Sequence, residues 1–173
     1  MFDPTIFENL KVVFEGAVYD LDLDGQIVVV HRSDLIDLAA MSRSYMVRYR
    51  MKEGRSPAEI RLSAGLLDLA GEKLEWRNAL PGCKLEIAFS LLLRNPVTAC
   101  KNIQDILEQI WGAETTIVQT LSFRYGDDGS RCHNEIVVQF ERKIGEGQVG
   151  DIPDLLEHTV RTLRQLEPYN MEE

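Results

Sequence analysis

The sequence has few cysteines, and their spacing argues against a disulfide framework. Three cysteines occur among 173 residues, Cys83, Cys100 and Cys132, and no two of them form a C-x-x-C pair. An odd number of widely spaced cysteines is typical of reduced thiols. The cysteine content therefore predicts a cytoplasmic location.

Long apolar runs are also missing. No stretch approaches the ~20 consecutive apolar residues that span a bilayer. The first ten residues, MFDPTIFENL, lack the basic and apolar regions of a signal peptide. We therefore expect no membrane association.

Basic residues are outnumbered, and the formal net charge is −9. A protein that neutralises phosphates needs a basic surface, so nucleic acid is not expected as a partner. Apolar residues make up 45% of the chain and charged residues 27%, which is ordinary for a globular protein. The length suits a single compact domain over residues 1–173.

The stretch before Asp24-Gly25 is compatible with two structures. Leu10 and Phe14 fit one face of a helix, whereas Val12 and Phe14 fit one face of a strand. Asp-Gly is a strong hairpin signal. We therefore favour a strand up to Leu23, paired with a strand over residues 26–32, and leave residues 11–18 open as helix or strand.

The other segments have clearer periodicity. The predicted elements are a helix from Ser33 to Met41, strands over 45–51 and 59–63, a helix over 64–74, an irregular segment over 75–82, a strand over 85–93, a helix over 96–111, a hairpin of 115–125 with 132–142, and a helix over 152–166.

In this assignment, residues 27–74 and 84–166 both have the order βαββα, which is most of a ferredoxin-like unit. The predicted fold class is α+β, with a mostly antiparallel sheet and helices packed on one face. The repeated order raises the hypothesis of two ferredoxin-like halves, about 1–80 and 81–173.

Three short motifs suggest ligands that their context argues against. Asp20, Asp22, Asp24 and Gly25 match the start of an EF-hand loop, but His31 stands where the loop needs a bidentate glutamate. The G-x-G-x-x-G string over 145–150 lacks the parallel strands of a dinucleotide site. We therefore expect neither calcium nor a dinucleotide cofactor.

The third motif is the run FRYGDDGSRCHNE, residues 123–135, which contains Asp127, Asp128, Cys132, His133 and Glu135. In a strand, Cys132 faces the side opposite to His133 and Glu135, because successive side chains alternate. One metal ion could not bind both Cys132 and His133 without a bulge. We predict no metal site, a buried structural Cys132, and a pairing of Leu121 with Ile136 across the hairpin.

The strongest candidate site is an arginine cluster. Residues 43–61 contain six basic residues and two acidic ones, a local charge of +4. Arg48, Arg50 and Arg61 are predicted to share one sheet face, and guanidinium groups suit carboxylate or phosphate ligands. The alternative is a solvated face whose arginines pair with nearby acids.

The sequence supports three hypotheses about function. The first is a non-catalytic cytoplasmic module that binds a small anionic ligand or a protein partner, as a homo-oligomer that covers its strand edges. The second is an enzyme in which the same arginines orient a small anionic metabolite. The third is a structural subunit of an assembly. No motif indicates a cofactor or a catalytic residue.

Overall fold

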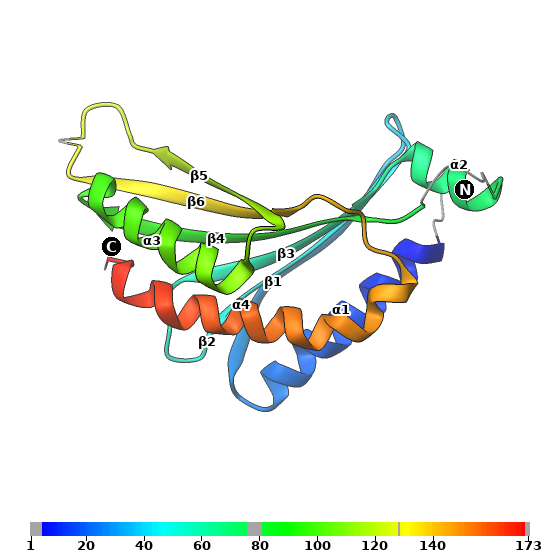
Figure 1. Cartoon of the computed structure of the whole chain (residues 1–173), viewed down its shortest axis with the longest axis horizontal. Coiled ribbons are helices and arrows are strands. Elements are labelled where there is room, and N and C mark those ends of the chain that lie inside the picture. Colours follow the sequence, from blue (N-terminus) through cyan, green and yellow to red (C-terminus); the bar gives the residue numbers. More distant parts are fainter. Residues whose placement is uncertain (1–4, 76–80, 128, 172–173) are drawn as a thin grey trace.

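The computed structural model describes residues 5–75, 81–127 and 129–171 (Figure 1). Most of the predicted irregular segment, residues 76–80, lies outside the described residues, as does Asp128. The helices are α1 (Thr5–Leu23), α2 (Leu66–Lys73), α3 (Pro96–Trp111) and α4 (Ile152–Leu166), with short 3-10 turns η1 (Glu146–Asp151) and η2 (Glu167–Tyr169) on either side of α4. The strands are β1 (Ile27–Asp37), β2 (Ser42–Met51), β3 (Pro57–Ala64), β4 (Lys84–Arg94), β5 (Thr115–Ser122) and β6 (Arg131–Phe140).

The described strands form a six-stranded antiparallel sheet in the order β1-β2-β3-β4-β6-β5. Helices α1, α3 and α4 pack against one face, and α2 lies at one end of the sheet (Figure 1). We call the other face, which none of these helices covers, the open face. The predicted α+β class, with an antiparallel sheet and helices on one face, is confirmed.

The core lies between the sheet and the three helices. Strand alternation directs apolar side chains toward the helices, so Ile87, Phe89 and Leu91 of β4 are buried. Helix α4 crosses over β2 and β3 and also contacts α1. Its buried residues include Ile152, Leu156, Val160 and Leu163. No helix among the described residues is both long and apolar enough to cross a bilayer.

The predicted strand up to Leu23 is wrong, because α1 continues through that residue. Phe7, Leu10, Phe14 and Val18 have helical spacing, and all four are buried. Gly25 has a φ of 72°, and the amide of Gln26 donates to the carbonyl of Leu21. A glycine with positive φ serves a helix end as well as a hairpin turn, and here it ends the helix.

The predicted helix from Ser33 to Met41 is also wrong. Strand β1 continues to Asp37 and pairs with β2 across a tight turn. The Asp37 side chain accepts hydrogen bonds from the amides of Ala39 and Ala40, and Met41 has a φ of 51°. The aspartate thus stabilises a turn rather than a helix start.

These corrections remove the predicted internal repeat. Residues 27–74 have the order βββα, whereas residues 84–166 have the predicted order βαββα. In the second segment β6 lies between β4 and β5, but no strand follows α4 among the described residues. The hypothesis of two ferredoxin-like halves is therefore not confirmed.

The β5–β6 hairpin is present with a longer loop than predicted. Leu121 pairs with Asn134, and Gln119 pairs with Ile136, a shift of two residues from the predicted register. A shift of two keeps every side chain on its predicted face. Cys132 is buried on the helix side, and His133 lies on the open face.

Candidate functional site

The predicted arginine cluster is held by acidic partners within the sheet. Glu59 is 6% exposed and lies between Arg48 and Arg61 on the open face. Arg48 Nε donates to one Glu59 oxygen at 2.6 Å, and Arg61 Nε donates to the other at 2.7 Å. Arg61 also pairs with Glu135 of β6 at 2.9 Å. These contacts are what the ion-pair interpretation of the cluster predicts.

Arg50 binds backbone rather than acids. Its Nη1 lies 3.2, 2.9 and 3.0 Å from the carbonyl oxygens of Met51, Lys52 and Gly54. The arginine therefore braces the turn between β2 and β3. The structure brings Arg48 and Arg61 together around Glu59, and it gives Arg50 a different set of partners.

The electrostatics of Glu59 are those of a structural ion pair. Burial alone raises its pKa, but the hydrogen bonds and charges of Arg61 and Arg48 outweigh burial, so the pKa of Glu59 lies below its ordinary value. A general acid or base near neutral pH needs a pKa shifted the other way. Glu59 is therefore suited to holding two arginines, not to proton transfer.

The aspartates of the predicted hairpin lie on and just after a helix. Asp20 and Asp22 belong to the last turns of α1, and positions two apart on a helix do not face each other. Asp22 Oδ2 accepts a hydrogen bond from the amide of Val29 at 3.4 Å. The geometry needed for a Ca²⁺ loop, in which the carboxylates converge, is not formed by these residues.

We predict that millimolar Ca²⁺ leaves the melting temperature unchanged, because a ligand that binds only the native state stabilises it by mass action. Differential scanning fluorimetry with and without CaCl₂ measures this, with MgCl₂ as the control for ionic strength. A saturable upward shift with CaCl₂ that disappears in Asp22→Ala would contradict the prediction.

The cysteines have the properties of unreactive thiols, and Cys83 and Cys132 are buried. All three are free, and burial raises the pKa of Cys83 to about 12 and that of Cys132 above its ordinary value. A thiol with a raised pKa is a weak nucleophile at neutral pH. Among the described residues, no group of three or more His, Cys, Asp or Glu side chains is placed to hold a metal ion. The segment from Gly145 to Gly150 is largely the 3-10 turn η1, which leads into α4.

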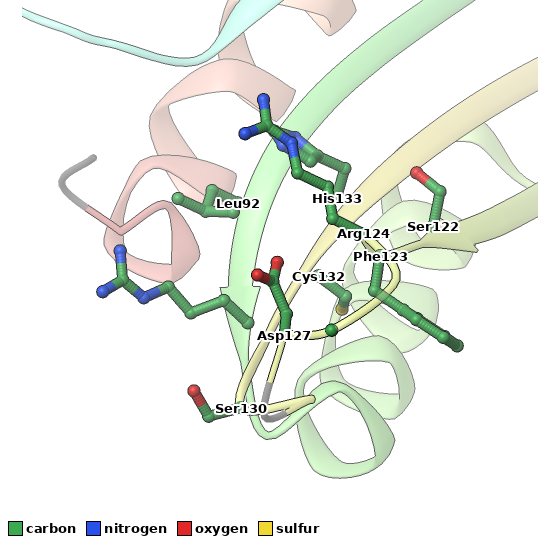
Figure 2. A pocket seen from close by; sticks show the side chains of 10 residues that line it. Leu92, Ser122, Phe123, Arg124, Asp127, Ser130, Cys132 and His133 are labelled. Atoms are coloured by element: carbon green, nitrogen blue, oxygen red, sulfur yellow. The ribbon is translucent and has the colours of Figure 1, made fainter.

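A hollow of about 630 Å³ lies where β4, β6 and the β5–β6 loop meet. In Figure 2 the polar ends of Arg124, Asp127 and His133 are directed toward the same side, and Phe123 points away from them. Leu92 lines the hollow from β4. We call this site the basic hollow, and its polar lining includes Ser122, Arg124, Asp127, Arg131 and His133.

Two arginines stand directly opposite each other beside this hollow. Arg94 ends β4, Arg131 begins β6, and the two residues are cross-strand partners on the open face. Like charges in this position destabilise a sheet. Arg124, which follows β5 in the loop, adds a third guanidinium.

These three arginines differ from the predicted cluster in their partners. No ion pair joins Arg94, Arg124 or Arg131 to any residue in the described part of the chain. Asp127 supplies one carboxylate to the lining, and Asp128 lies outside the described residues. Within the described residues, the hollow therefore has more positive than negative side chains.

A second hollow of about 610 Å³ adjoins the first one along the open face. Leu92 and His133 line both. Asn170 and Met171 also line the second hollow. The amide of Leu92 donates a hydrogen bond to the side-chain oxygen of Asn170, and the amide of Met171 donates one to the carbonyl of Leu92. The two hollows together offer an extended surface rather than a deep enclosed cavity.

Sequence reasoning missed Arg94, Arg124 and Arg131. In the sequence, Arg124 and Arg131 lie in a run whose acids, cysteine and histidine suggest a metal or a nucleophile rather than an anion. Arg94 joins them only because β4 pairs with β6. Two arginines at facing strand ends are a usable signal once the strand order is known.

Comparisons with known protein families, with curated proteins and with solved structures find no match for this chain.

Proposed function

We propose that this chain is a non-catalytic binding module that takes up an anionic ligand at the basic hollow. The observation that carries the proposal is the facing pair Arg94 and Arg131, which has no acidic partner among the described residues. An anion bound between these arginines would supply the missing charge. The guanidinium groups and the Ser122 hydroxyl provide donors that suit carboxylate or phosphate oxygens.

The arginines around Glu59 differ from those of the basic hollow, and this difference supports the proposal. There, two arginines on neighbouring strands share one buried carboxylate. At the basic hollow the same kind of cross-strand arrangement lacks such a carboxylate in the described residues. In a chain of net charge −9, a group of arginines that forms no ion pair with an acid among the described residues favours an external anion.

A binding role is favoured over catalysis by the groups around the hollow. Cys132 lines it, but the raised pKa of its thiol keeps it protonated at neutral pH. Catalytic sites typically hold a group whose pKa is moved toward the working pH. The reduced cysteines also suit a cytoplasmic module.

The test is a titration with inorganic phosphate and with citrate, followed by amide chemical shifts. We expect saturable shifts centred on Leu92, Arg94 and residues 122–133, with a dissociation constant in the millimolar range or below. Shifts centred on Arg48, Arg50 and Arg61 would instead place the ligand at the cluster predicted from sequence.

The titration is repeated on one test variant and one matched control. Arg131→Gln removes a guanidinium from the basic hollow, and Arg48→Gln removes one from the cluster around Glu59. We expect at least about tenfold weaker binding in the first, equivalent to ~1.4 kcal/mol, and no change in the second. Small unsaturable shifts spread over all basic surface residues would overturn the proposal.

The unliganded protein should become more stable when the like-charge pair is removed. We expect Arg131→Glu to raise the free energy of unfolding by about 0.3–1 kcal/mol, because a carboxylate opposite Arg94 replaces repulsion with attraction. The same variant should lose anion binding. Urea unfolding measures the first effect, and a loss of stability would show that Arg131 has a structural role instead.

A further inference from the structure

Strand β5 forms an open edge of the sheet next to the basic hollow. It pairs only with β6, and no other strand of the described residues lies along its outer side. An edge strand presents unpaired amide and carbonyl groups to solvent. The strand ends at Ser122, which lines the hollow, and Arg124 follows two residues later.

The other edge of the sheet, β1, is protected in ways that β5 is not. Strand β1 has a register irregularity between Val29 and His31, and it carries ionisable side chains. Arg32 and Asp34 form ion pairs with Glu15 and Lys11 of α1, so the helix is tied to this edge. Bulges, charges and covering elements all discourage pairing with another chain.

Strand β5 lacks these devices. Its sequence, TTIVQTLS, contains no charged residue and no proline, and its pairing with β6 shows no irregularity. Val118 and Leu121 are exposed, and Phe123, directly after the strand, is 71% exposed. An uncharged, β-branched, exposed edge is the kind of surface that accepts an added strand.

We propose that the ligand is an extended acidic segment of a partner protein, which adds to the outer edge of β5 and places its carboxylates at the basic hollow. This inference rests on the proposed function, because it names the ligand of the same site. The edge supplies main-chain hydrogen bonds, and the arginines supply charge complementarity. The two features are contiguous, so one extended ligand reaches both.

The edge favours a peptide over other anions. A small anion or a nucleic acid can neutralise arginines, but neither has the alternating amide and carbonyl groups that pair with a strand. Every described pair in this sheet is antiparallel, and we assign the same orientation to the ligand. Because β5 runs toward the hollow, the acidic residues then lie at the N-terminal end of the bound segment.

The experiment uses a synthetic peptide with two N-terminal glutamates followed by alternating threonine and valine. Three matched peptides serve as controls. One has glutamines in place of the glutamates. The other two carry N-methyl groups on alternate residues along one backbone edge, and the methylated positions of the second are shifted by one residue from those of the first. Binding to the full chain is measured by fluorescence polarisation and by amide chemical shifts. These control peptides leave the protein unchanged, so its fold is not altered.

We expect the acidic peptide to shift the amides of residues 115–122 together with those of Arg94 and Arg131. The glutamine peptide should bind at least about tenfold more weakly, and one of the two N-methylated peptides should lose binding because its β5-facing amides are blocked. Moving the glutamates to the C-terminal end should also weaken binding. In the protein, Arg131→Gln should weaken binding of the acidic peptide, while Arg48→Gln should not.

The outcomes separate this inference from the proposed function. Phosphate or citrate binding at the hollow without any peptide effect on β5 would overturn the inference and leave the anion-binding proposal in place. Absence of binding by every probe would overturn both. The free chain could instead dimerise through β5, which light scattering and concentration-dependent shifts over residues 115–122 would detect. That result would assign this edge to a second copy and overturn the proposal of an acidic partner segment. Tight binding of single-stranded nucleic acid at the hollow, with β5 unaffected, would also overturn the proposal of an acidic peptide ligand.

Discussion

Replacing Phe14 with alanine is expected to lower the free energy of unfolding by about 3–5 kcal/mol. Phe14 is 1% exposed and lies on the face of α1 that packs onto the core. The substitution removes a whole aromatic side chain and leaves a cavity that the neighbouring helix and sheet fill only in part. Urea unfolding followed by circular dichroism measures the loss.

The matched control is Val12→Ala on the same helix. Val12 is 56% exposed, so its substitution should change the free energy of unfolding by less than about 0.5 kcal/mol. In a strand, Val12 and Phe14 would share a face and would be buried together. Comparable losses from both substitutions would therefore contradict the helical assignment of α1.

Replacing Glu59 with glutamine should cost about 2 kcal/mol of stability, the second largest effect we expect. The change removes the charge that Arg48 and Arg61 share while keeping the shape of the side chain. The loss is smaller than for a fully buried ion pair, because both arginine side chains reach solvent. Glu53→Gln, at an exposed position in the β2–β3 turn, should leave stability unchanged.

The contribution of Glu59 to the free energy of unfolding should depend on pH. The pKa of Glu59 is lower in the folded chain than its ordinary value of 4.5, so the ionised carboxylate stabilises the fold above that pH. The stabilisation is lost as pH falls through the lowered folded value. The difference in stability between wild type and Glu59→Gln should thus be constant near neutral pH and shrink below about pH 4.5. A difference that grows on acidification would rule out this role for Glu59.

Most of the fold can be predicted from sequence because the stronger patterns are local. The alternating residues of β4 and the proline and glycine that bound α3 each specify one structure. Gly112, for example, has the predicted helix-ending position and a φ of 73°. Such elements depend on a few neighbouring residues and on one buried face.

The two wrong predictions, a strand up to Leu23 and a helix from Ser33 to Met41, occur where one residue type serves two structures. Gly25 was interpreted as a hairpin glycine and instead ends α1, because both structures need positive φ. Asp37 caps a turn, although the apolar residues around it have near-helical spacing. Leu35 and Leu38, two apolar residues within the predicted helix, are exposed.

The candidate site was harder to predict than the fold, because it depends on strand order. Arg94 and Arg131 are far apart in the chain and meet only through the β4–β6 pairing. The predicted cluster of Arg48, Arg50 and Arg61 was visible because its members lie close in sequence. Its acidic partner Glu135, by contrast, comes from a distant strand. Sequence proximity thus favours the arginines that have acidic partners over those that form no ion pair among the described residues.

The position of α4 across β2 and β3 has a consequence for how the protein is made. A ribosome releases β1, β2 and β3 long before residues 152–166, so a buried residue such as Tyr49, which lies against Thr159 of α4, is not covered until α4 has been made. Nascent chains that expose apolar strands are prone to aggregation. We therefore expect premature stop codons before Ile152 to yield insoluble chains, whereas chains that include α4 can cover these strands.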